Sequence, residues 1–410
     1  MKFFSFCILS IAISVQITAQ QNPWYKRTEA EGKLHLDSLL TLYPDSAAFN
    51  ARKKELQSCF LKTMGIDLSK NRTVPRAIIR PKRVMKGYTV ENVAFESFPG
   101  YYVTGSLYRP LHAKGKYPAI VCPHGHFPER RAVDNLDKQG RYRPDMQIRC
   151  AVLATMGAVV LDYDMYAWGE SRLQSGLDEN DTLMHYTGFS LAIQTWNSIR
   201  AVDFLTSLQD VDVKRIGVTG ASGGGTQTFL LTALDNRIAA SAPVVMVSSS
   251  FYGGCGCESG LPIHSCGKYK TNNAEIAAMA VPRPMLVVSD GTDWTASVPG
   301  TDFPYLKKVY SLYRQEDAVS NVHLPKDLHD YGYTKRLPVY RFFDAVLGLH
   351  PEKLADANGG INESFVTVEP AGAQQVFSKN NPLPPDAIKG HENIVKAFKS
   401  MQGDFPDLQY

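Results

Sequence analysis

The chain contains 410 residues, of which 44% are hydrophobic and 20% are charged, and its formal net charge is +4 at pH 7. These proportions are typical of a globular protein with a proper core, built as one large domain or two modest ones. So small a charge on a chain of this length argues against nucleic acid as a bulk partner.

Residues 1–19 have the pattern of a secretory signal peptide. Lys2 provides the positive end, the run from Phe3 to Ile17 is mostly apolar, and Ala19 is a small residue suited to cleavage. The apolar run is too short and too often interrupted by serine to span a bilayer, and no later stretch is long enough. We therefore expect an exported protein, periplasmic or secreted, with no stable membrane insertion after signal removal; the alternative is a buried N-terminal helix.

Residues 20–84 are expected to form a helical N-terminal extension. Within residues 24–70, apolar side chains recur at the three- and four-residue spacing of a helix face. The segment "YTVENVAFESFPGYYVTGSLYRP" that follows predicts two strands joined by a turn at Pro99-Gly100. We expect the extension to pack on the sheet rather than to form a separate domain.

Short apolar strands then alternate with helices. The strands are indicated by "YPAIVCPHG", "GAVVLDYDMYAWG", "RIGVTG", "SAPVVMVSS", "RPMLVVSD" and "NVHLPKD", and the helices by "SLAIQTWNSIRAVDFLTSL", "TQTFLLTAL" and "PYLKKVYSLYR". This alternation predicts an α/β fold with a doubly wound, mostly parallel sheet and helices on both faces. We place this domain at residues 85–350 and a C-terminal extension at residues 351–410, with a late strand pair expected at "FVTVEP" and "QQVFS".

The stretch Gly220-Ala221-Ser222-Gly223-Gly224 matches the G-x-S-x-G pattern of a nucleophile elbow. A predicted strand precedes it and a predicted helix follows, which is the context that the pattern requires. The glycines let strand and helix approach closely around a strained turn, and the helix start directs N–H groups at a developing anion. The pattern therefore predicts that Ser222 is a nucleophile rather than a small residue in a glycine-rich loop.

A serine hydroxyl needs a base that takes its proton. His329 follows the last predicted strand and is the best placed histidine. Other histidines lie in the N-terminal helix, before the serine, in a cysteine-rich loop, inside a strand or at the end of the last helix: His35, His124, His126, His264, His323 and His350.

The carboxylate that orients the base is expected in the loop between serine and histidine. Asp293 lies a few residues beyond the end of a predicted strand, where the acid of this architecture tends to be found. Asp290, which is expected to hold the turn, and Glu258, after the preceding strand, are the alternatives. The chain order Ser222, Asp293, His329 matches that of α/β-hydrolases and not that of chymotrypsin or subtilisin.

An oxyanion requires two N–H donors. The backbone of Gly223, directly after the nucleophile, should provide one, and the backbone of His126, in "CPHGHFPER", the other. The alternative for this loop is metal binding by His124 and His126, whose H-x-H spacing is a known ligand pattern but lacks an acidic or cysteine partner nearby in sequence.

With these residues in place, the chain resembles the α/β-hydrolase superfamily over about residues 85–350. The motifs are "VDVKRIGVTGASGGG", "PHGH", "DGTDWT" and "LHDYGY". Within the superfamily, the chain resembles the acetyl xylan esterase and dienelactone-hydrolase-like branch, especially secreted bacterial carbohydrate esterases. The resemblance implies a Ser222–His329–Asp293 triad that needs no cofactor and no metal.

A cysteine-rich insert at residues 253–267 departs from the acetyl xylan esterases. In an exported protein we expect a disulfide there, either Cys257–Cys266 or Cys255–Cys266. Free thiols, or a zinc site that also includes His264, are the alternatives. Because the insert follows a strand at the carboxyl edge of the sheet, where ligands bind in open α/β folds, it and its Glu258 are expected to line the substrate pocket.

An arginine-rich loop at residues 129–149 is the second departure. Arg130 and Arg131 are candidate substrate-binding residues, because guanidinium groups bind carboxylates in a bidentate fork and a uronic acid would suit them. The alternative is a solvated loop with local aspartates as counter-charges. Trp168, after another strand, is a candidate for stacking on a sugar ring, or for packing.

The sequence therefore predicts a serine esterase that acts on an esterified carbohydrate through an acyl-enzyme, with acetyl xylan esterase-like deacetylation as the leading hypothesis. A methyl-ester or uronoyl-ester hydrolase acting on pectin-like or glucuronate-containing glycans is the first alternative. A peptidase of the prolyl-oligopeptidase type and a non-catalytic carbohydrate-binding protein on a hydrolase scaffold are the others.

Overall fold

The computed structural model describes residues 27–70, 72–112, 115–126, 135–178, 181–185, 187–259 and 261–403. The predicted signal peptide and the side chains of Arg130 and Arg131 lie outside these described residues. Across them, no helix is long and apolar enough to cross a membrane.

The described residues form one ten-stranded sheet. Its first four strands are antiparallel: β1 (Ala77–Ile79), β2 (Arg83–Val84), β3 (Tyr88–Phe98) and β4 (Tyr101–Pro110). The other six run parallel to one another: β5 (Tyr117–Pro123), β6 (Val159–Tyr163), β7 (Val211–Ala221), β8 (Ile238–Val244), β9 (Met285–Asp290) and β10 (Val319–Leu324). The spatial order β1-β3-β4-β6-β5-β7-β8-β9-β10 places strands β7 to β10 side by side.

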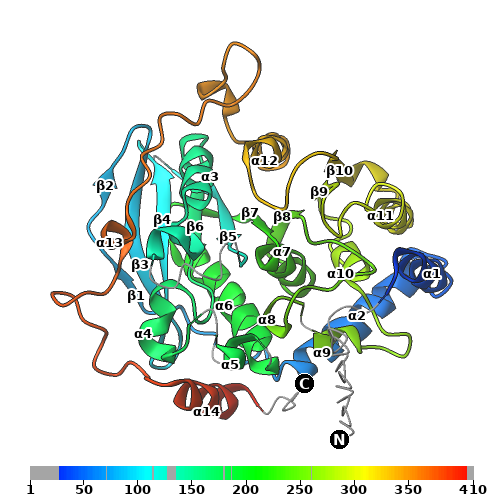
Figure 1. Ribbon diagram of the computed structural model, residues 1–410, viewed down its shortest axis with the longest axis horizontal. Coiled ribbons are helices and arrows are strands. Elements are labelled where there is room, and N and C mark those ends of the chain that lie inside the picture. The colour runs from blue at the N-terminus through cyan, green and yellow to red at the C-terminus, as the bar shows by residue number, and fades with distance from the viewer. Residues whose placement is uncertain are drawn as a thin grey trace, which may run out of the picture.

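Helices cover both faces of this sheet (Figure 1). The α-helices are α1 (Glu29–Leu40), α2 (Ser46–Thr63), α3 (Pro144–Thr155), α4 (Arg172–Ser175), α5 (Thr182–His185), α6 (Gly188–Ser207), α7 (Gly223–Leu234), α8 (Gly256–Ser259), α9 (Leu261–His264), α10 (Asn273–Ala278), α11 (Asp302–Ser311), α12 (Tyr333–Leu347), α13 (Ala371–Gln374) and α14 (His391–Gln402). Short 3-10 turns lie at Leu136–Lys138, Gly140–Tyr142, Gly169–Ser171, Glu316–Ala318 and Pro351–Lys353. The predicted fold class, a mostly parallel sheet covered on both faces, is confirmed.

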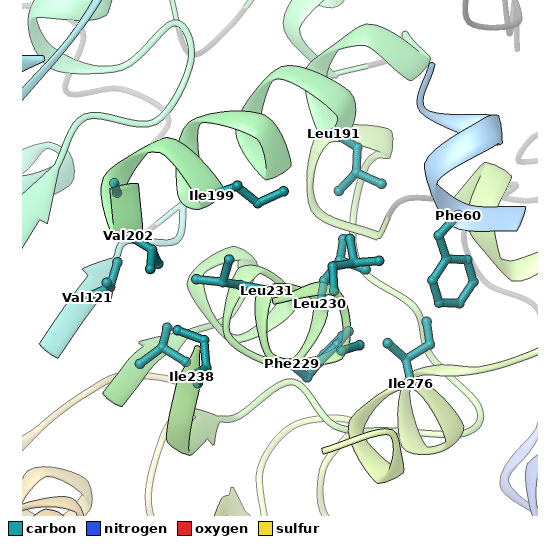
Figure 2. Close-up of a cluster of buried hydrophobic side chains, with 14 of the residues drawn as sticks. Phe60, Val121, Leu191, Ile199, Val202, Phe229, Leu230, Leu231, Ile238 and Ile276 are labelled. Atoms are coloured by element: carbon teal, nitrogen blue, oxygen red, sulfur yellow. The ribbon is translucent and has the colours of Figure 1, made fainter. Parts of the chain in front are cut away.

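The alternation of side chains along the parallel strands builds two apolar layers. Ile120 belongs to the layer under α3 and α12, whereas its neighbour Val121 belongs to the larger layer under α6, α7 and α10. Figure 2 shows Leu230 and Leu231 of α7 in the middle of that larger layer, close to Ile199 of α6. Helix α7, which begins directly after Ser222, is therefore held on the sheet by buried apolar contacts.

The N-terminal helices pack on the sheet domain. Asp45 caps α2 by accepting from the Ala48 N–H, and Phe60 of α2 joins the same apolar layer as α7. The buried Arg52 of α2 donates to both carboxylate oxygens of Glu275 in α10, at 2.9 and 3.0 Å. These contacts attach α2 to the sheet domain.

Two local expectations were wrong. Cys266 forms a disulfide with Cys59 of α2, 207 residues away, and Cys255 and Cys257 are free thiols. The prediction relied on proximity in sequence, whereas α2 packs against the insert and brings Cys59 to it. The late strand pair is also absent from the described tail, where Glu170 instead accepts from the N–H groups of Val376 and Phe377.

The Cys59–Cys266 disulfide should contribute strongly to stability, because it closes a loop of 207 residues. We expect the Cys59→Ala/Cys266→Ala double variant to lose about 2–5 kcal/mol of unfolding free energy. Urea denaturation followed by tryptophan fluorescence measures this loss. Wild type treated with reductant should shift in the same direction, and an unchanged midpoint in both samples would contradict a stabilising disulfide.

Candidate active site

Ser222 lies at a strained turn between β7 and α7. Its φ of 55° and ψ of −124° place it in a region that non-glycine residues rarely occupy. A Cβ on Gly220 would lie 2.4 Å from the carbonyl oxygen of Pro123, and one on Gly224 would lie 2.3 Å from the same atom. Only glycine fits at these two positions, so the sequence pattern of the elbow has a direct steric cause.

The candidate catalytic side chains follow four neighbouring parallel strands. Ser222 follows β7, Glu258 lies in the insert after β8, Asp293 follows β9 and His329 follows β10. The carboxyl ends of these strands meet at one edge of the sheet. The Tyr331 hydroxyl, two residues after His329, lies 2.6 Å from Thr219 Oγ1 of β7, which fixes the histidine loop against the strand that carries Ser222.

His329 and Asp293 form a close pair, with Nδ1 of the imidazole 2.5 Å from Oδ2 of the carboxylate. The other oxygen of Asp293 accepts from the Thr295 N–H at 2.6 Å. The Trp294 ring lies 4.6 Å from the imidazole, centroid to centroid. Hydrogen bonds and packing therefore hold both members of the pair from several sides.

Asp290 supports this loop from beside the Asp293–His329 pair, with a carboxylate oxygen within 4.8 Å of the imidazole. Its carboxylate accepts from the N–H groups of Thr292 and Asp293, at 3.1 and 3.2 Å. The buried Lys335 lies 3.4 Å from Asp290 and donates to the carbonyl of Leu328, next to His329. These contacts agree with the expectation that Asp290 holds the turn.

Ser222 donates its hydroxyl proton to Glu258, with 2.5 Å between Oγ and Oε1. The other carboxylate oxygen of Glu258 accepts from the Gly254 N–H at 2.9 Å. Burial raises the pKa of Glu258, but His126, Ser222 and the Gly254 N–H outweigh burial and lower it to about 2. Because the Ser222 hydroxyl carries only one proton, Ser222 does not donate a hydrogen bond to His329 in this conformation.

The predicted oxyanion loop lies directly against the elbow. A Cβ on Gly125 would lie 2.5 Å from the Ala221 carbonyl oxygen and 3.2 Å from the Gly223 nitrogen. His124 Nδ1 lies 3.0 Å from the Gly125 carbonyl, and its Nε2 accepts from the Met165 N–H at 3.1 Å. Burial lowers the pKa of His124 to about 3, so its ring is neutral and both nitrogens are engaged, which removes it from the H-x-H metal alternative.

The side chain of His126 points into a cluster of thiols. Its Nε2 lies 3.1 Å from Cys257 Sγ and 3.7 Å from Cys255 Sγ, and its Nδ1 lies 3.6 Å from Glu258 Oε1. His185 of α5 lies beside the same sulfur, with Nδ1 3.4 Å from Cys257 Sγ. Burial disfavours the charged His126 ring, but Cys255 and Glu258 outweigh burial and raise its pKa to about 10.

The arginine-rich loop is mainly a structural element where the structure describes it. Arg141 is fully buried and pairs with Asp164 and Glu170, at 3.0 and 2.8 Å. Arg149 is also fully buried and lies over the Tyr331 ring. Arg141 and Arg149 are therefore buried structural residues, whereas Asn135, Asp137 and Lys138 of the same loop are exposed, as the alternative expected.

Arg143 and Trp168 have different relations to the site. Burial lowers the pKa of Arg143, while Asp145 and Asp330 act in the opposite direction, so Arg143 lies within electrostatic reach of the residue after His329. Trp168 is only 6% exposed, and its ring packs edge-on against His124 and His126. Trp168 therefore packs against the predicted oxyanion loop and has little exposed surface on which a sugar could stack.

A serine on a strained strand-to-helix turn, a histidine–carboxylate pair after later strands and a glycine-containing loop against the elbow are the features of an α/β-hydrolase. A family model for acetyl xylan esterases matches residues 74–253. The solved structure of methylesterase BT1017 is 44% identical in sequence, covers 93% of this chain and 82% of its own, and superposes with a TM-score of 0.81. The chain belongs to the same family of carboxylic ester hydrolases as methylesterase BT1017.

More distant curated relatives match over part of their length. Acetyl esterase Axe7A of Xylanibacter ruminicola is 28% identical over 148 residues, which are 34% of this chain and 31% of that protein. The 4-O-methyl-glucuronoyl methylesterase of Neurospora crassa is 24% identical over 233 residues, 48% of this chain and 52% of that protein. The chain thus spans about half of the fungal relative and about a third of the bacterial one.

Sequence reasoning missed two features of the site. It ranked Glu258 only as a third acid or a pocket residue and did not connect it with the Ser222 hydroxyl. It also grouped Cys255 and Cys257 with His264 and Cys266, but Cys266 is in the disulfide and His264 Nε2 lies 2.7 Å from Asn273 Oδ1. The motif Cys255-x-Cys257-Glu258 was the sequence signal that could have linked Glu258 with the two cysteines. Nothing in the sequence singled out His185.

The elbow predicts a severe effect of a single added methyl group. Gly220→Ala places a Cβ against two backbone oxygens, those of Pro123 and Gly224, which cannot move away as a side chain could. If Ser222 is the nucleophile that the sequence predicts, kcat should fall on the order of 10²-fold or more, because Ser222 is displaced. Steady-state hydrolysis of p-nitrophenyl acetate measures this.

Gly372→Ala is the matched control, since a Cβ there meets no atom within 4 Å. It should keep wild-type kcat. Equal activity in both variants would contradict the steric account of the elbow.

Proposed function

We propose that this protein hydrolyses methyl esters of uronic acid residues in a glycan. The observation that carries this proposal is the 44% identity to methylesterase BT1017 over 93% of the chain. The partial match to a 4-O-methyl-glucuronoyl methylesterase supports the same ester chemistry. This is the first alternative that the sequence left open.

Ser222 is the proposed nucleophile. Its hydroxyl must first turn from Glu258 towards His329, which takes the proton while Oγ bonds to the ester carbonyl carbon. The tetrahedral oxyanion is bound by the backbone N–H groups of Gly223 and His126. The close approach of Gly125 to the Gly223 nitrogen supports this placement of the two donors.

His329 then returns the proton to the leaving methoxide, which departs as methanol and leaves a Ser222 acyl-enzyme. Water, deprotonated by His329, attacks the same carbon, His329 returns the proton to Oγ as the Oγ–carbon bond breaks, and the uronic acid is released. Asp293 keeps the proton of Nδ1 in place and balances the charge of the imidazolium. The 2.5 Å contact between Asp293 and His329 supports this role.

Arg143 is the proposed contact for a uronate next to the esterified sugar. Its side chain retains 11% exposure, unlike those of Arg141 and Arg149, and it lies within electrostatic reach of Asp330. A guanidinium binds a carboxylate in a bidentate fork. Its ion pair with Asp145, at 2.8 Å, would hold the guanidinium group in position for that contact.

Deacetylation of a glycan is the second candidate. The match of the acetyl xylan esterase family model to residues 74–253 favours it. The two reactions share the same triad and differ in which side of the ester belongs to the sugar. Products distinguish them, because a methylesterase releases methanol and an acetylesterase releases acetate.

The triad predicts a large and selective loss of turnover. Ser222→Ala and His329→Ala should each lower kcat by about 10⁴–10⁶-fold, and Asp293→Asn by about 10⁴-fold because the wrong tautomer of His329 results. His323→Ala is the control, since His323 lies in β10 and its Nδ1 is 2.9 Å from Ser289 Oγ. It should keep kcat within a few-fold of wild type.

These variants are measured on a panel of methyl-esterified pectic glycans, methyl glucuronoyl xylan and acetylated xylan, with released methanol and acetate quantified separately. Methanol release that disappears in Ser222→Ala supports the proposal. Acetate release alone would select the second candidate, and full activity of Ser222→Ala would exclude the triad.

The proposed role of Arg143 predicts that its replacement weakens binding of glycans with free uronates but leaves the rate of ester hydrolysis on an uncharged substrate unchanged. Arg143→Gln should raise KM about tenfold or more on a partly methylated glycan with free uronates, because one charge-assisted contact, worth about 1.5–3 kcal/mol, is lost. Activity on uncharged p-nitrophenyl acetate should remain at the wild-type level. Equal losses on both substrates would show that Arg143 only supports the fold.

A further inference from the structure

Four potential metal ligands meet beside the catalytic serine, and nothing in the proposed esterase reaction uses their side chains. His126 comes from the oxyanion loop, His185 from α5, and Cys255 and Cys257 from the insert after β8. One donor atom of each residue lies within 4.8 Å of the donor atoms of the other three. We infer that His126, His185, Cys255 and Cys257 together bind one zinc ion.

The donor set favours zinc. Two thiolate sulfurs with two imidazole nitrogens form a combination that is typical of tetrahedral zinc sites, whereas magnesium and calcium prefer oxygen ligands. On binding, both cysteines coordinate as thiolates and both imidazoles in their neutral form, so two thiolates balance the charge of one Zn²⁺ ion. The protons that the cluster holds go to solvent, including the one that Cys255 and Glu258 favour on the His126 ring.

The distances between donor atoms fit such a site. With Zn–S near 2.3 Å and Zn–N near 2.0–2.1 Å, neighbouring ligand atoms of a tetrahedron lie roughly 3.3–3.8 Å apart. Cys257 Sγ lies 3.1 Å from His126 Nε2 and 3.4 Å from His185 Nδ1, and Cys255 Sγ lies 3.7 Å from His126 Nε2. Zinc therefore needs only small shifts of side chains that already converge.

The burial of the sulfurs supports binding as well. Cys255 is 5% exposed and Cys257 is 1% exposed, and neither is in a disulfide. Two buried free thiols that face two imidazoles are arranged as ligands, because a cysteine kept only for packing needs no polar partner. Four protein ligands also complete the zinc coordination, so the ion would not bind substrate.

The site would act on catalysis by positioning other groups. With Nε2 of His126 on the metal, its Nδ1–H lies 3.6 Å from Glu258 Oε1, slightly beyond hydrogen-bond distance, and a small shift would complete a carboxylate–histidine–zinc arrangement. Glu258 in turn accepts the Ser222 hydroxyl, and the backbone of His126 is the proposed oxyanion donor. The metal would thus fix His126, whose backbone is the proposed oxyanion donor, and Glu258, which accepts the Ser222 hydroxyl in this conformation.

Zinc content tests the inference without any substrate, so its failure is distinct from failure of the proposed function. Tag-free protein is incubated with excess Zn²⁺, gel-filtered and analysed by inductively coupled plasma mass spectrometry. We expect one zinc per chain in wild type and a loss of bound zinc in Cys255→Ala/Cys257→Ala. Zinc-free wild type, or equal zinc in both proteins, would overturn the inference, as would mass-spectrometric evidence for a Cys255–Cys257 disulfide.

Cys122→Ala/Cys150→Ala is the matched control, because it removes a second pair of buried free cysteines that lies in the layer under α3. It should retain one zinc per chain. Circular dichroism of both double variants separates loss of metal from loss of fold. If Cys255→Ala/Cys257→Ala does not fold, His185→Ala, a change at a partly exposed ligand, takes its place with the same expectation.

Loading the protein with Co²⁺ in place of zinc provides a second measurement. The absorption of bound Co²⁺ reports on the ligands themselves and not on the stability of the fold. The Co²⁺-loaded protein should show thiolate-to-cobalt charge-transfer absorption that disappears in the Cys255→Ala/Cys257→Ala variant and persists in the control. Zinc removal by chelation should lower kcat on p-nitrophenyl acetate several-fold with little change in KM, and zinc should restore it. A Co²⁺ spectrum without thiolate bands would overturn the assignment of these ligands.

Discussion

The site depends on one steric constraint, the close approach of β5, β7 and α7 at the turn that carries Ser222. The carbonyl of Pro123 lies where a Cβ of either Gly220 or Gly224 would have to be. That approach forces Ser222 into its left-handed conformation and presents its hydroxyl at the carboxyl edge of the sheet. The strain persists because the buried apolar side chains of α7 hold the helix against the strands.

The order of the parallel strands determines which other side chains lie close to Ser222. Strands β8, β9 and β10 follow β7 in order across the sheet, so each of their loops delivers one group to the same edge. Two carboxylates arrive with different partners: Asp293 contacts His329, and Glu258 accepts the Ser222 hydroxyl. In this conformation the Ser222 hydroxyl donates its proton to Glu258. The proposed reaction begins when the hydroxyl turns and donates to His329 instead.

Local patterns made most of this architecture predictable, whereas contacts between distant segments did not. The elbow around Ser222 and the order of the predicted acid and base follow from short motifs placed after apolar strands. The Cys59–Cys266 bridge joins residues 207 positions apart, and no spacing rule could select it over nearer cysteines. The same holds for His185, which reaches Cys257 from a short helix that carries no periodic signal.

The insert after β8 shows why those long-range contacts matter. The chain between β8 and β9 is long, and such a segment keeps much conformational freedom unless contacts tie it down. At one end it is tied to α2 by Cys266, and at the other Cys255 and Cys257 lie against His126 and His185. Glu258 lies next to this second attachment, so the precision of its contact with Ser222 depends on how firmly the cysteine–histidine cluster is held. A zinc ion there would replace several weak polar contacts with four coordinate bonds, and the carboxylate would then be positioned by the sheet and the metal together.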